Sequence, residues 1–228
     1  MTYSFGVDFS HWDGAVNWDR AKQVGVEFAF CKASEGVSFV DNQFARNYTE
    51  AIRVSIPMGA YHWYHPWIDP IQQALHFTKI AAACAGLPHV LDVEDKRRVP
   101  ADYSAKLFAC LREIESLTGH RPIIYTSFDY WRKYVGDIDW PLEYPLWIAN
   151  YTSCAGPLVP LPWHPMQWTF WQYSDRGDLN LAAPGWESLI TETVPPTPPI
   201  PPQPHARFES PVGTEAERAS GEIWPGDW

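Results

Sequence analysis

Residues 89–95 read His89-Val90-Leu91-Asp92-Val93-Glu94-Asp95, a short apolar run that becomes acidic at its end. Its β-branched residues indicate a short strand. Side chains alternate along a strand, so Leu91 and Val93 share one face while Asp92 and Glu94 share the other. The Cβ atoms of Asp92 and Glu94 are then about 6.5 Å apart, at about 3.3 Å per residue. The stretch therefore predicts a strand that aims two carboxyl groups in one direction.

Two carboxyl groups this close raise the free-energy cost of ionising each other, so one of them can keep its proton near neutral pH. A protonated carboxyl beside an ionised one is the chemistry that breaks glycosidic bonds. A solvated acidic edge strand is the alternative, because most charged side chains lie on protein surfaces. The rest of the chain decides between these two interpretations.

The composition excludes several classes of partner. The chain has 228 residues, enough for one sizeable core, and 46% of them are hydrophobic. Its formal net charge of -10 repels phosphate backbones and anionic membrane surfaces, so we expect no nucleic-acid partner and no membrane insertion. The aromatic share is 15%, with 13 Trp and 11 Tyr, which suits a cleft that stacks on sugar rings as well as an ordinary core.

The cysteines and the N-terminus point to a reducing compartment. Cys31, Cys84, Cys110 and Cys154 show no metal-like spacing, so we expect four buried thiols, no metal and no cofactor. The chain begins with a strand-like segment at 3–7, without the basic and apolar regions of a signal peptide. We expect synthesis in a host cytoplasm and release to the cell wall during phage lysis, or a virion-associated protein. A bacterial autolysin with its own export route is the alternative.

Strand-like and helix-like segments alternate along the chain, which is typical of an α/β fold. Asp69-Pro70 predicts a helix start, and Gly119 a helix end. Strands are predicted at 5–9, 27–32, 57–63, 89–95, 122–126, 145–151 and 166–173, and helices at 18–24, 41–53, 69–85, 101–118 and 128–135. Residues 1–193 are thus expected to form a single domain. A Pro-rich linker at 194–204 and an acidic tail at 205–228, flexible or docked, follow it.

Polar residues end several of the expected strands. In a closed barrel of parallel strands these ends meet at one mouth, where active sites are built. The interior strand positions are small or apolar, which indicates a packed core below that mouth. The regular placement of the polar residues favours an active site over a solvated edge. These residues are Asp8, Glu35, Tyr61, His62, Asp92, Glu94, Tyr125, Asn150 and Gln172.

Several motifs resemble those of the glycoside hydrolase family 25 lysozymes, in the same order and over about residues 4–190. The resemblance implies an irregular, flattened TIM-like (β/α)5(β)3 barrel, in which five βα units are completed by further strands. The matching segments are Gly6-Val7-Asp8-Phe9-Ser10-His11-Trp12-Asp13-Gly14, Lys32-Ala33-Ser34-Glu35-Gly36, Gly59-Ala60-Tyr61-His62, Leu91-Asp92-Val93-Glu94, Leu146-Trp147-Ile148-Ala149-Asn150-Tyr151, and Trp171-Gln172-Tyr173 with Asp178-Leu179-Asn180.

The resemblance implies a peptidoglycan hydrolase that cleaves the β-1,4 bond between N-acetylmuramic acid and N-acetylglucosamine. Glu94 matches the general acid, and Asp8, Asp92 and Asp178 match acidic residues of the same cleft. We expect a substrate-assisted reaction, in which Asp92 orients the acetamido group that attacks the anomeric carbon and Glu94 then activates water. A carboxylate nucleophile and an inverting water are the alternatives.

Further residues are expected to contact glycan strands, and the protein is expected to be a monomer. Glu35 can belong to the site or pair with Lys32. Only residues 174–177 separate the Trp-Gln-Tyr motif from Asp178, a shorter hairpin than in the family, so either the hairpin is lost or the cleft wall is rebuilt. A non-catalytic cell-wall carbohydrate-binding barrel and a chitinase-like hydrolase are the rival functions. The expected substrate-binding residues are Tyr61, Tyr125, Trp147, Asn150, Gln172 and Glu35.

Overall fold

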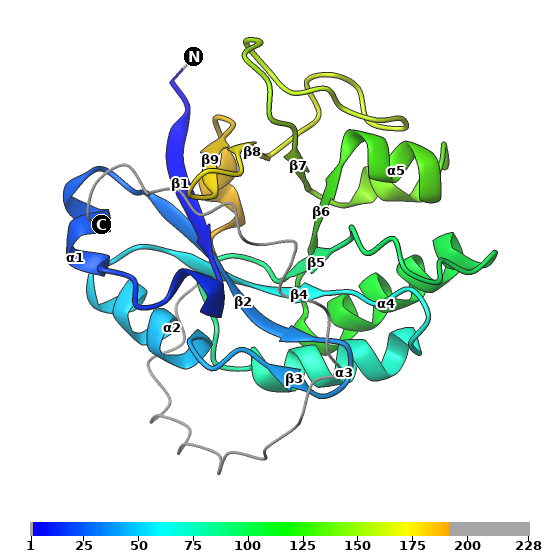
Figure 1. Cartoon of the computed structure of the whole chain (residues 1–228), viewed down its shortest axis with the longest axis horizontal. Coiled ribbons are helices and arrows are strands. Elements are labelled where there is room, and N and C mark those ends of the chain that lie inside the picture. Colours follow the sequence, from blue (N-terminus) through cyan, green and yellow to red (C-terminus); the bar gives the residue numbers. More distant parts are fainter. Residues whose placement is uncertain (1, 192–228) are drawn as a thin grey trace, which may run out of the picture.

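The computed structural model describes residues 2–191, so the boundary expected at 193 and the segments at 194–204 and 205–228 lie outside it. Within this range the strands form one sheet in the order β1-β9-β8-β7-β6-β5-β4-β2-β3 (Figure 1). Because β1 also pairs with β2, eight of these strands close into a barrel, and β3 extends from β2. The strands are β1 (Ser4–Phe9), β2 (Phe28–Glu35), β3 (Phe39–Val40), β4 (Met58–Trp63), β5 (Val90–Asp92), β6 (Ile123–Ser127), β7 (Leu146–Ala149), β8 (Phe170–Ser174) and β9 (Leu179–Ala182).

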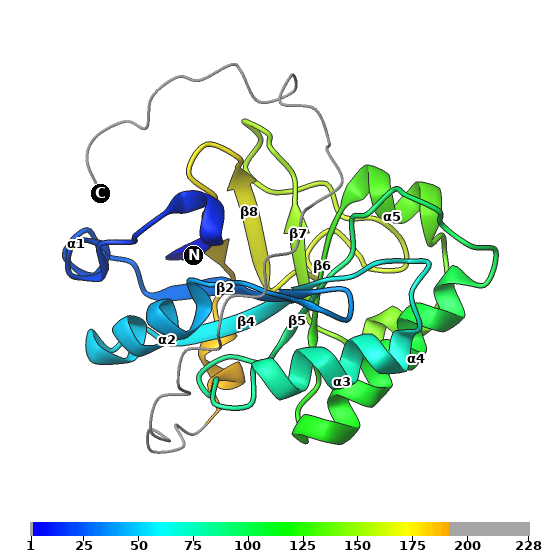
Figure 2. The ribbon, with the colours of Figure 1, turned by 60° about the horizontal axis from the view of Figure 1, so that its bottom comes forward.

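Neighbouring barrel strands run parallel from β1 through β8, and β9 returns antiparallel between β8 and β1. An α-helix follows each of β1, β4, β5 and β6 and the β2–β3 hairpin, whereas β7, β8 and β9 follow one another without one. Figure 2 shows α2, α3 and α4 outside the sheet on one flank. The predicted (β/α)5(β)3 barrel is therefore confirmed. The helices are α1 (Trp18–Gln23), α2 (Phe44–Arg53), α3 (Pro70–Ile80), α4 (Tyr103–Thr118) and α5 (Phe128–Tyr134).

Large side chains from alternate strand positions fill the barrel interior. Phe30 of β2 stacks on Trp147 of β7 with ring centroids 4.3 Å apart, and Phe28 packs 5.1 Å from Trp186. Gly6 of β1 makes room for Phe28, because a Cβ at Gly6 would lie 2.3 Å from that ring. The barrel is thus a packed core rather than a pore.

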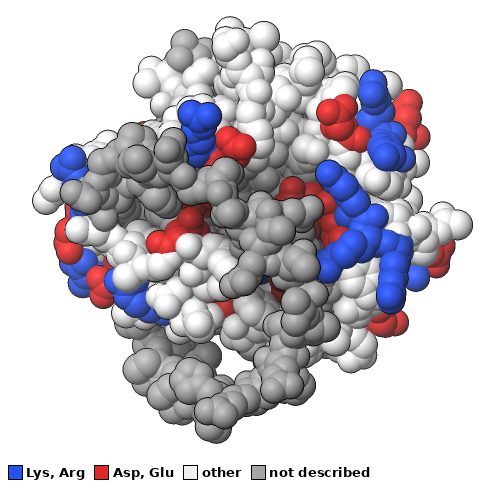
Figure 3. Space-filling view, in the orientation of Figure 1, with Lys and Arg blue, Asp and Glu red and all other residues white. Residues whose placement is uncertain are grey.

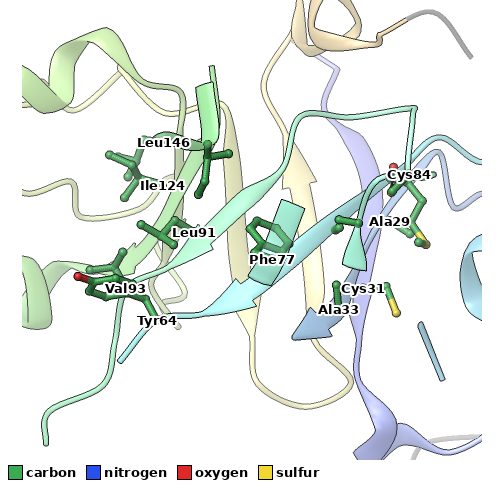
Figure 4. Close-up of a cluster of buried hydrophobic side chains, with 14 of the residues drawn as sticks. Ala29, Cys31, Ala33, Tyr64, Phe77, Cys84, Leu91, Val93, Ile124 and Leu146 are labelled. Atoms are coloured by element: carbon green, nitrogen blue, oxygen red, sulfur yellow. Dashed lines mark hydrogen bonds between the residues drawn. The ribbon is translucent and has the colours of Figure 1, made fainter. Parts of the chain in front are cut away.

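The opposite faces of the same strands pack against the helices. Leu91 and Val93 lie on the outer side of the sheet with Phe77 of α3, as Figure 4 shows. This confirms the predicted alternation, in which Leu91 and Val93 share one face and Asp92 and Glu94 the other. The cluster drawn in Figure 4 therefore fixes the direction in which both carboxyl groups point.

The helix starts and ends predicted from the sequence agree with the structure to different degrees. Asp69 caps α3 by accepting a hydrogen bond from Gln72 N at 2.9 Å, and Gly119 ends α4 in the left-handed conformation, as predicted. Asp41 Oδ1 accepts a hydrogen bond from Gln43 N at 2.9 Å just before α2 (Phe44–Arg53) begins, and its Oδ2 binds the backbone and ring of His11. The local contact thus precedes the helix, and the same carboxylate adds a tertiary contact.

Several predicted boundaries were wrong. The strand expected at 89–95 ends at Asp92, the helix expected to reach 85 ends at Ile80, and residues 166–169 precede β8 rather than belong to it. Strands β3 and β9 were not predicted. Cys154 is exposed, whereas the other three thiols are buried as expected. No helix between residues 2 and 191 is long and apolar enough to cross a bilayer.

Candidate active site

A cavity of about 200 Å³ lies where the parallel strands end. It brings together residues from β1, β4, β5, β6, β7 and β8 and from the connections that follow them. Four of its ten lining residues are acids and five are aromatic. The lining residues are Asp8, Tyr61, Trp63, Asp92, Glu94, Tyr125, Trp147, Tyr151, Gln172 and Asp178.

Asp92 and Glu94 lie on the same wall of this cavity. β5 ends at Asp92, but Val93 N donates to Tyr125 O at 2.9 Å, so the chain continues alongside β6 for one more residue. Thr126 Oγ1 also donates to Val93 O at 2.9 Å. These bonds hold Val93 in place and keep Glu94 on the side of Asp92, although regular strand pairing has ended.

Burial controls the protonation of this pair. It raises the pKa of Asp92 well above its usual range, and the nearby Glu94 carboxylate adds to the effect. Burial also raises the pKa of Glu94 to about 7, against the opposing charges of Lys96 and Lys32. Among the described residues, none donates a hydrogen bond to Asp92 Oδ1. Both effects favour the protonated forms of these carboxyl groups, most strongly for Asp92, whereas the sequence led us to expect an ionised Asp92.

Asp8 faces this pair from β1 and is held by two amides. Gln172 Nε2 donates to Asp8 Oδ2 at 2.8 Å, and Asn180 Nδ2 donates to the same oxygen at 2.7 Å. Burial and the carboxylate of Asp178 raise the pKa of Asp8 well above its usual range, while these two hydrogen bonds favour its ionised form. Asp8 is thus positioned by buried amides that sequence motifs alone did not assign to it.

Asp178 reaches the cavity through the short turn between β8 and β9. Ser174 pairs with Leu179 in this antiparallel hairpin, so the hairpin is shortened but not lost. Asp178 adopts a left-handed conformation with φ of 44°, and its carbonyl accepts a hydrogen bond from Asp8 N at 3.1 Å. Burial, followed by the nearby Asp13, raises the pKa of Asp178 to about 7.

Gln172 connects the aromatic wall to the acids. Its Oε1 accepts hydrogen bonds from the hydroxyl groups of Tyr125 and Tyr151, each at 2.8 Å, while its Nε2 binds Asp8. The indole of Trp147 similarly donates to Asn180 Oδ1 at 2.8 Å. Because each donor and acceptor has a partner, these side chains hold fixed positions around the acids.

Of the expected substrate-binding residues, Tyr61, Tyr125, Trp147 and Gln172 line the cavity. Trp63 and Tyr151 also line it but were missed. Trp63 stands two residues after Tyr61, so the alternation along β4 already placed both on one face. Tyr151 closes the Trp-Ile-Ala-Asn-Tyr motif, where the preceding Asn was chosen instead.

Glu35 and Asn150 are not among the residues that line this cavity. Glu35 Oε2 lies 2.8 Å from Lys32 Nζ, and its Oε1 lies 3.1 Å from His65 Nε2, so the ion-pair alternative holds. Asn150 Oδ1 accepts a hydrogen bond from Leu158 N at 2.9 Å and shapes the loop after β7. Both residues support neighbouring parts of the site rather than the ligand-facing surface.

The cavity offers carboxyl groups and aromatic rings but no metal-binding cluster. Among residues 2–191, no group of three or more His, Cys, Asp or Glu side chains has the arrangement to hold a metal ion. Carboxyl groups with raised pKa values beside aromatic rings suit general acid catalysis on a sugar polymer. This is the chemistry that the arrangement itself supports.

Comparison with known proteins assigns the family. Residues 7–181 match the sequence profile described as Glycosyl hydrolases family 25. The chain belongs to this family. The match spans β1 to β9 and thus the whole barrel that forms the cavity, which confirms the resemblance inferred from the motifs.

Individual relatives agree with the family assignment. Lysozyme M1 of Streptomyces globisporus is 32% identical over 188 residues, which cover 77% of this chain and 63% of that protein. The solved structure of a bacterial lysozyme from Streptomyces coelicolor is 28% identical and superposes with a TM-score of 0.75 over 85% of this chain and 100% of that one. The structure of a muramidase from Acremonium alcalophilum is 30% identical, with a TM-score of 0.72 over 82% of this chain and 98% of that one.

The curated relatives include longer proteins than this family 25 chain. It spans 63% of the length of Lysozyme M1 and 64% of the length of YegX from Escherichia coli K12. The matched part is the barrel. The similarity therefore concerns the fold and the cavity described above.

Proposed function

We propose that this family 25 protein is a peptidoglycan hydrolase of the lysozyme type. It would cleave the β-1,4 bond between N-acetylmuramic acid and N-acetylglucosamine. The observation that carries the proposal is the gathering of Asp8, Asp92, Glu94 and Asp178 in one cavity walled by Tyr and Trp rings. Aromatic rings bind the faces of sugars, and the carboxyl groups supply the proton and the negative charge that glycoside hydrolysis requires.

Glu94 acts as the general acid in this proposal. A pKa raised to about 7 leaves a large fraction of its carboxyl groups protonated near neutral pH, able to protonate the departing glycosidic oxygen. The same carboxylate, once it has lost the proton, can accept one from an attacking water molecule. Glu94 is the less buried member of the pair, which suits a group that has to exchange a proton with solvent between turnovers.

Asp92 assists through the acetamido group of the sugar. Its Oδ1 has no hydrogen-bond donor among the described residues, and an acetamido N–H would supply one. A hydrogen bond to a carboxylate favours the ionised form, so substrate binding would lower the pKa of Asp92. The proton would then be retained on Glu94, while ionised Asp92 stabilises the positive charge that develops as the acetamido oxygen attacks the anomeric carbon.

Asp8 and Asp178 add two further carboxyl groups to the lining of this cavity. Their cavity-facing oxygens can accept hydrogen bonds from sugar hydroxyl groups and favour a cationic transition state. Gln172 would act as a positioning residue, because it holds Asp8 and two tyrosine hydroxyl groups at 2.8 Å.

Mass spectrometry of digested peptidoglycan tests the bond that is cleaved. We expect new reducing ends on N-acetylmuramic acid in the wild-type digest and none with Glu94→Gln. Glu187→Gln, at an exposed position of the short helix Trp186–Leu189, serves as the matched control and should digest normally. New reducing ends on N-acetylglucosamine, or equal cleavage of chitin, would favour a different hydrolase. Full activity of Glu94→Gln would refute the general-acid role.

The stereochemistry of the first product tests the mechanism. Proton NMR during digestion should show the β-anomer first, because attack by the acetamido oxygen followed by water gives net retention. A thiazoline analogue of the sugar oxazoline should inhibit the wild type strongly if the acetamido group participates. Initial appearance of the α-anomer would indicate an inverting water, and retention without thiazoline inhibition would indicate a carboxylate nucleophile.

A further inference from the structure

Three consecutive basic residues follow the acidic pair in the connection from β5 to α4. Lys96, Arg97 and Arg98 are all exposed, and Glu94 stands only two residues before the first of them. Figure 3 shows Lys and Arg side chains gathered beside acidic ones near α4. In a chain with a net charge of -10, such a concentration of positive charge beside the cavity requires an explanation.

Arg97 pairs with Asp95 and anchors this segment. Its Nε and Nη2 lie 2.9 and 2.8 Å from the two oxygens of the buried Asp95 carboxylate, which lowers the pKa of Asp95. Asp95 Oδ2 also lies 2.7 Å from Nδ1 of His65, whose ring stacks 4.5 Å from that of Trp67. The positive charge of Arg97 is therefore neutralised by Asp95, and the loop has a rigid attachment to the barrel.

Lys96 and Arg98 have no such compensation. Among residues 2–191, no carboxylate forms an ion pair with either side chain. The Arg98 guanidinium lies 6.0 Å from the Trp67 ring, which supports it from one side. Its backbone has φ of 46°, a left-handed conformation that a non-glycine residue keeps only with support from its surroundings. The connection that follows the cavity-lining Glu94 thus carries two exposed cations without a carboxylate partner among the described residues.

Lys96 also acts against the proposed chemistry of Glu94. Its charge lowers the pKa of Glu94 and so favours loss of the proton that a general acid needs. An anion bound to Lys96 would cancel this effect. The position of the lysine is therefore easier to explain if the substrate supplies a negative charge.

We propose that Lys96 and Arg98 bind carboxylate groups carried by the glycan, next to the bond that Glu94 protonates. This inference rests on the proposed function and specifies its substrate further. A chitin chain is neutral and has no carboxylate for these cations to bind. The muramic acid units of peptidoglycan carry a lactyl carboxyl group, which is either free or extended by a peptide with carboxylates of its own. The pair would thus distinguish peptidoglycan from neutral glycans.

The test uses soluble peptidoglycan strands, either intact or with their carboxylates converted to neutral amides by carbodiimide and ammonia. Release of reducing ends is compared for wild type, the double variant Lys96→Gln/Arg98→Gln and a control with the same charge change, Arg20→Gln/Lys79→Gln. Arg20 and Lys79 are exposed on α1 and α3 and do not line the cavity. The variant Lys96→Arg/Arg98→Lys keeps both charges.

On the wild type, amidation of the strands should raise KM by about threefold to tenfold, as expected for two exposed charge pairs. The Lys96→Gln/Arg98→Gln protein should show the raised KM on intact strands and no further change on amidated ones. The control and the charge-preserving variant should behave like wild type. Salt at about 0.5 M should reduce the difference, since it screens exposed charges. Strands whose peptides have been removed by an amidase show which carboxylate binds. The KM difference between wild type and the Lys96→Gln/Arg98→Gln protein persists on these strands if the lactyl carboxylate binds, and disappears if the peptide carboxylates bind.

The proposal would be overturned if the Lys96→Gln/Arg98→Gln protein differed from wild type by the same factor in KM on intact and on amidated strands. The two cations would then act only on the acidic cleft and not on the carboxylates of the glycan. The proposal would also be overturned if amidation of the strands raised the KM of this variant as much as it raises the KM of wild type. If wild type releases no reducing ends from intact strands, the proposed hydrolase function itself fails, so the two failures are distinguishable. Thermal unfolding of each variant confirms that the compared proteins are folded.

Discussion

The substitution Glu94→Gln should stabilise the fold at alkaline pH while abolishing hydrolysis. Burial raises the pKa of Glu94 from its ordinary 4.5 to about 7. Below pH 4.5 the side chain is protonated in both folded and unfolded chains. Between the two values the unfolded chain ionises first, so the contribution of Glu94 to folding stability is lost as the pH rises through 7. Glutamine is neutral throughout and avoids this loss.

The size of the effect follows from the difference between the two pKa values. Each pH unit corresponds to about 1.36 kcal/mol, so a rise from 4.5 to about 7 corresponds to about 3 kcal/mol above pH 8. The side chain keeps partial contact with solvent, which brings our expectation to about 2–3 kcal/mol. Active-site groups are often destabilising in this way, because their chemistry requires an unfavourable environment.

Urea unfolding at pH 4 and pH 8.5 measures this difference directly. We expect the free energies of unfolding of wild type and Glu94→Gln to agree at pH 4 and to differ by about 2–3 kcal/mol at pH 8.5, with the variant more stable. Glu187→Gln, at an exposed position, should show no such pH-dependent gain. A variant that is less stable than wild type at pH 8.5, or equally stabilised at both pH values, would refute the burial argument.

Three further predictions concern the same barrel. The kcat/KM of hydrolysis should fall about tenfold per pH unit above about pH 7, as Glu94 ionises; an alkaline limb near pH 4.5 would contradict this. Asn180→Leu removes a donor 2.7 Å from Asp8 and should lower the free energy of unfolding in urea by about 1–3 kcal/mol; an unchanged midpoint would contradict it. Gly6→Ala places a Cβ 2.3 Å from the Phe28 ring and should cost about 1–3 kcal/mol in thermal unfolding, whereas a neutral effect would mean that the ring moves freely.

The barrel could be predicted from the sequence because its signals are local. Alternating strand and helix patterns, the Asp69-Pro70 start and the Gly119 end each depend on neighbouring residues, and the structure confirms them. The exact residues at which helices and strands begin and end depend on tertiary contacts instead. The carboxylate of Asp41 binds Gln43 N before α2 begins and also binds His11, and this second contact joins parts of the chain that are 30 residues apart.

In the candidate site, too, some features follow from local sequence patterns and others depend on tertiary contacts. Period-two alternation correctly placed Asp92 and Glu94 on one face, and applied consistently it would also have found Trp63 beside Tyr61. The partners of Glu35 could not be chosen from sequence, since His65 reaches it from a different strand connection. A short-range pattern predicts the direction of a side chain, whereas the competition between its possible partners depends on the folded barrel.

The location of the proton shows why burial has to be known before a mechanism is assigned. From spacing alone, repulsion between Asp92 and Glu94 appeared sufficient to leave one protonated and one ionised. In the folded chain, removal from water is the largest effect on both groups, and the more deeply buried Asp92 resists ionisation more strongly. Asp92 Oδ1 has no hydrogen-bond donor among the described residues, so a donor supplied by the substrate would favour the ionised form of Asp92. Under the proposed mechanism, a substrate that brings an N–H to this oxygen would favour ionised Asp92, and a sugar that lacks the acetamido group should be cleaved more slowly.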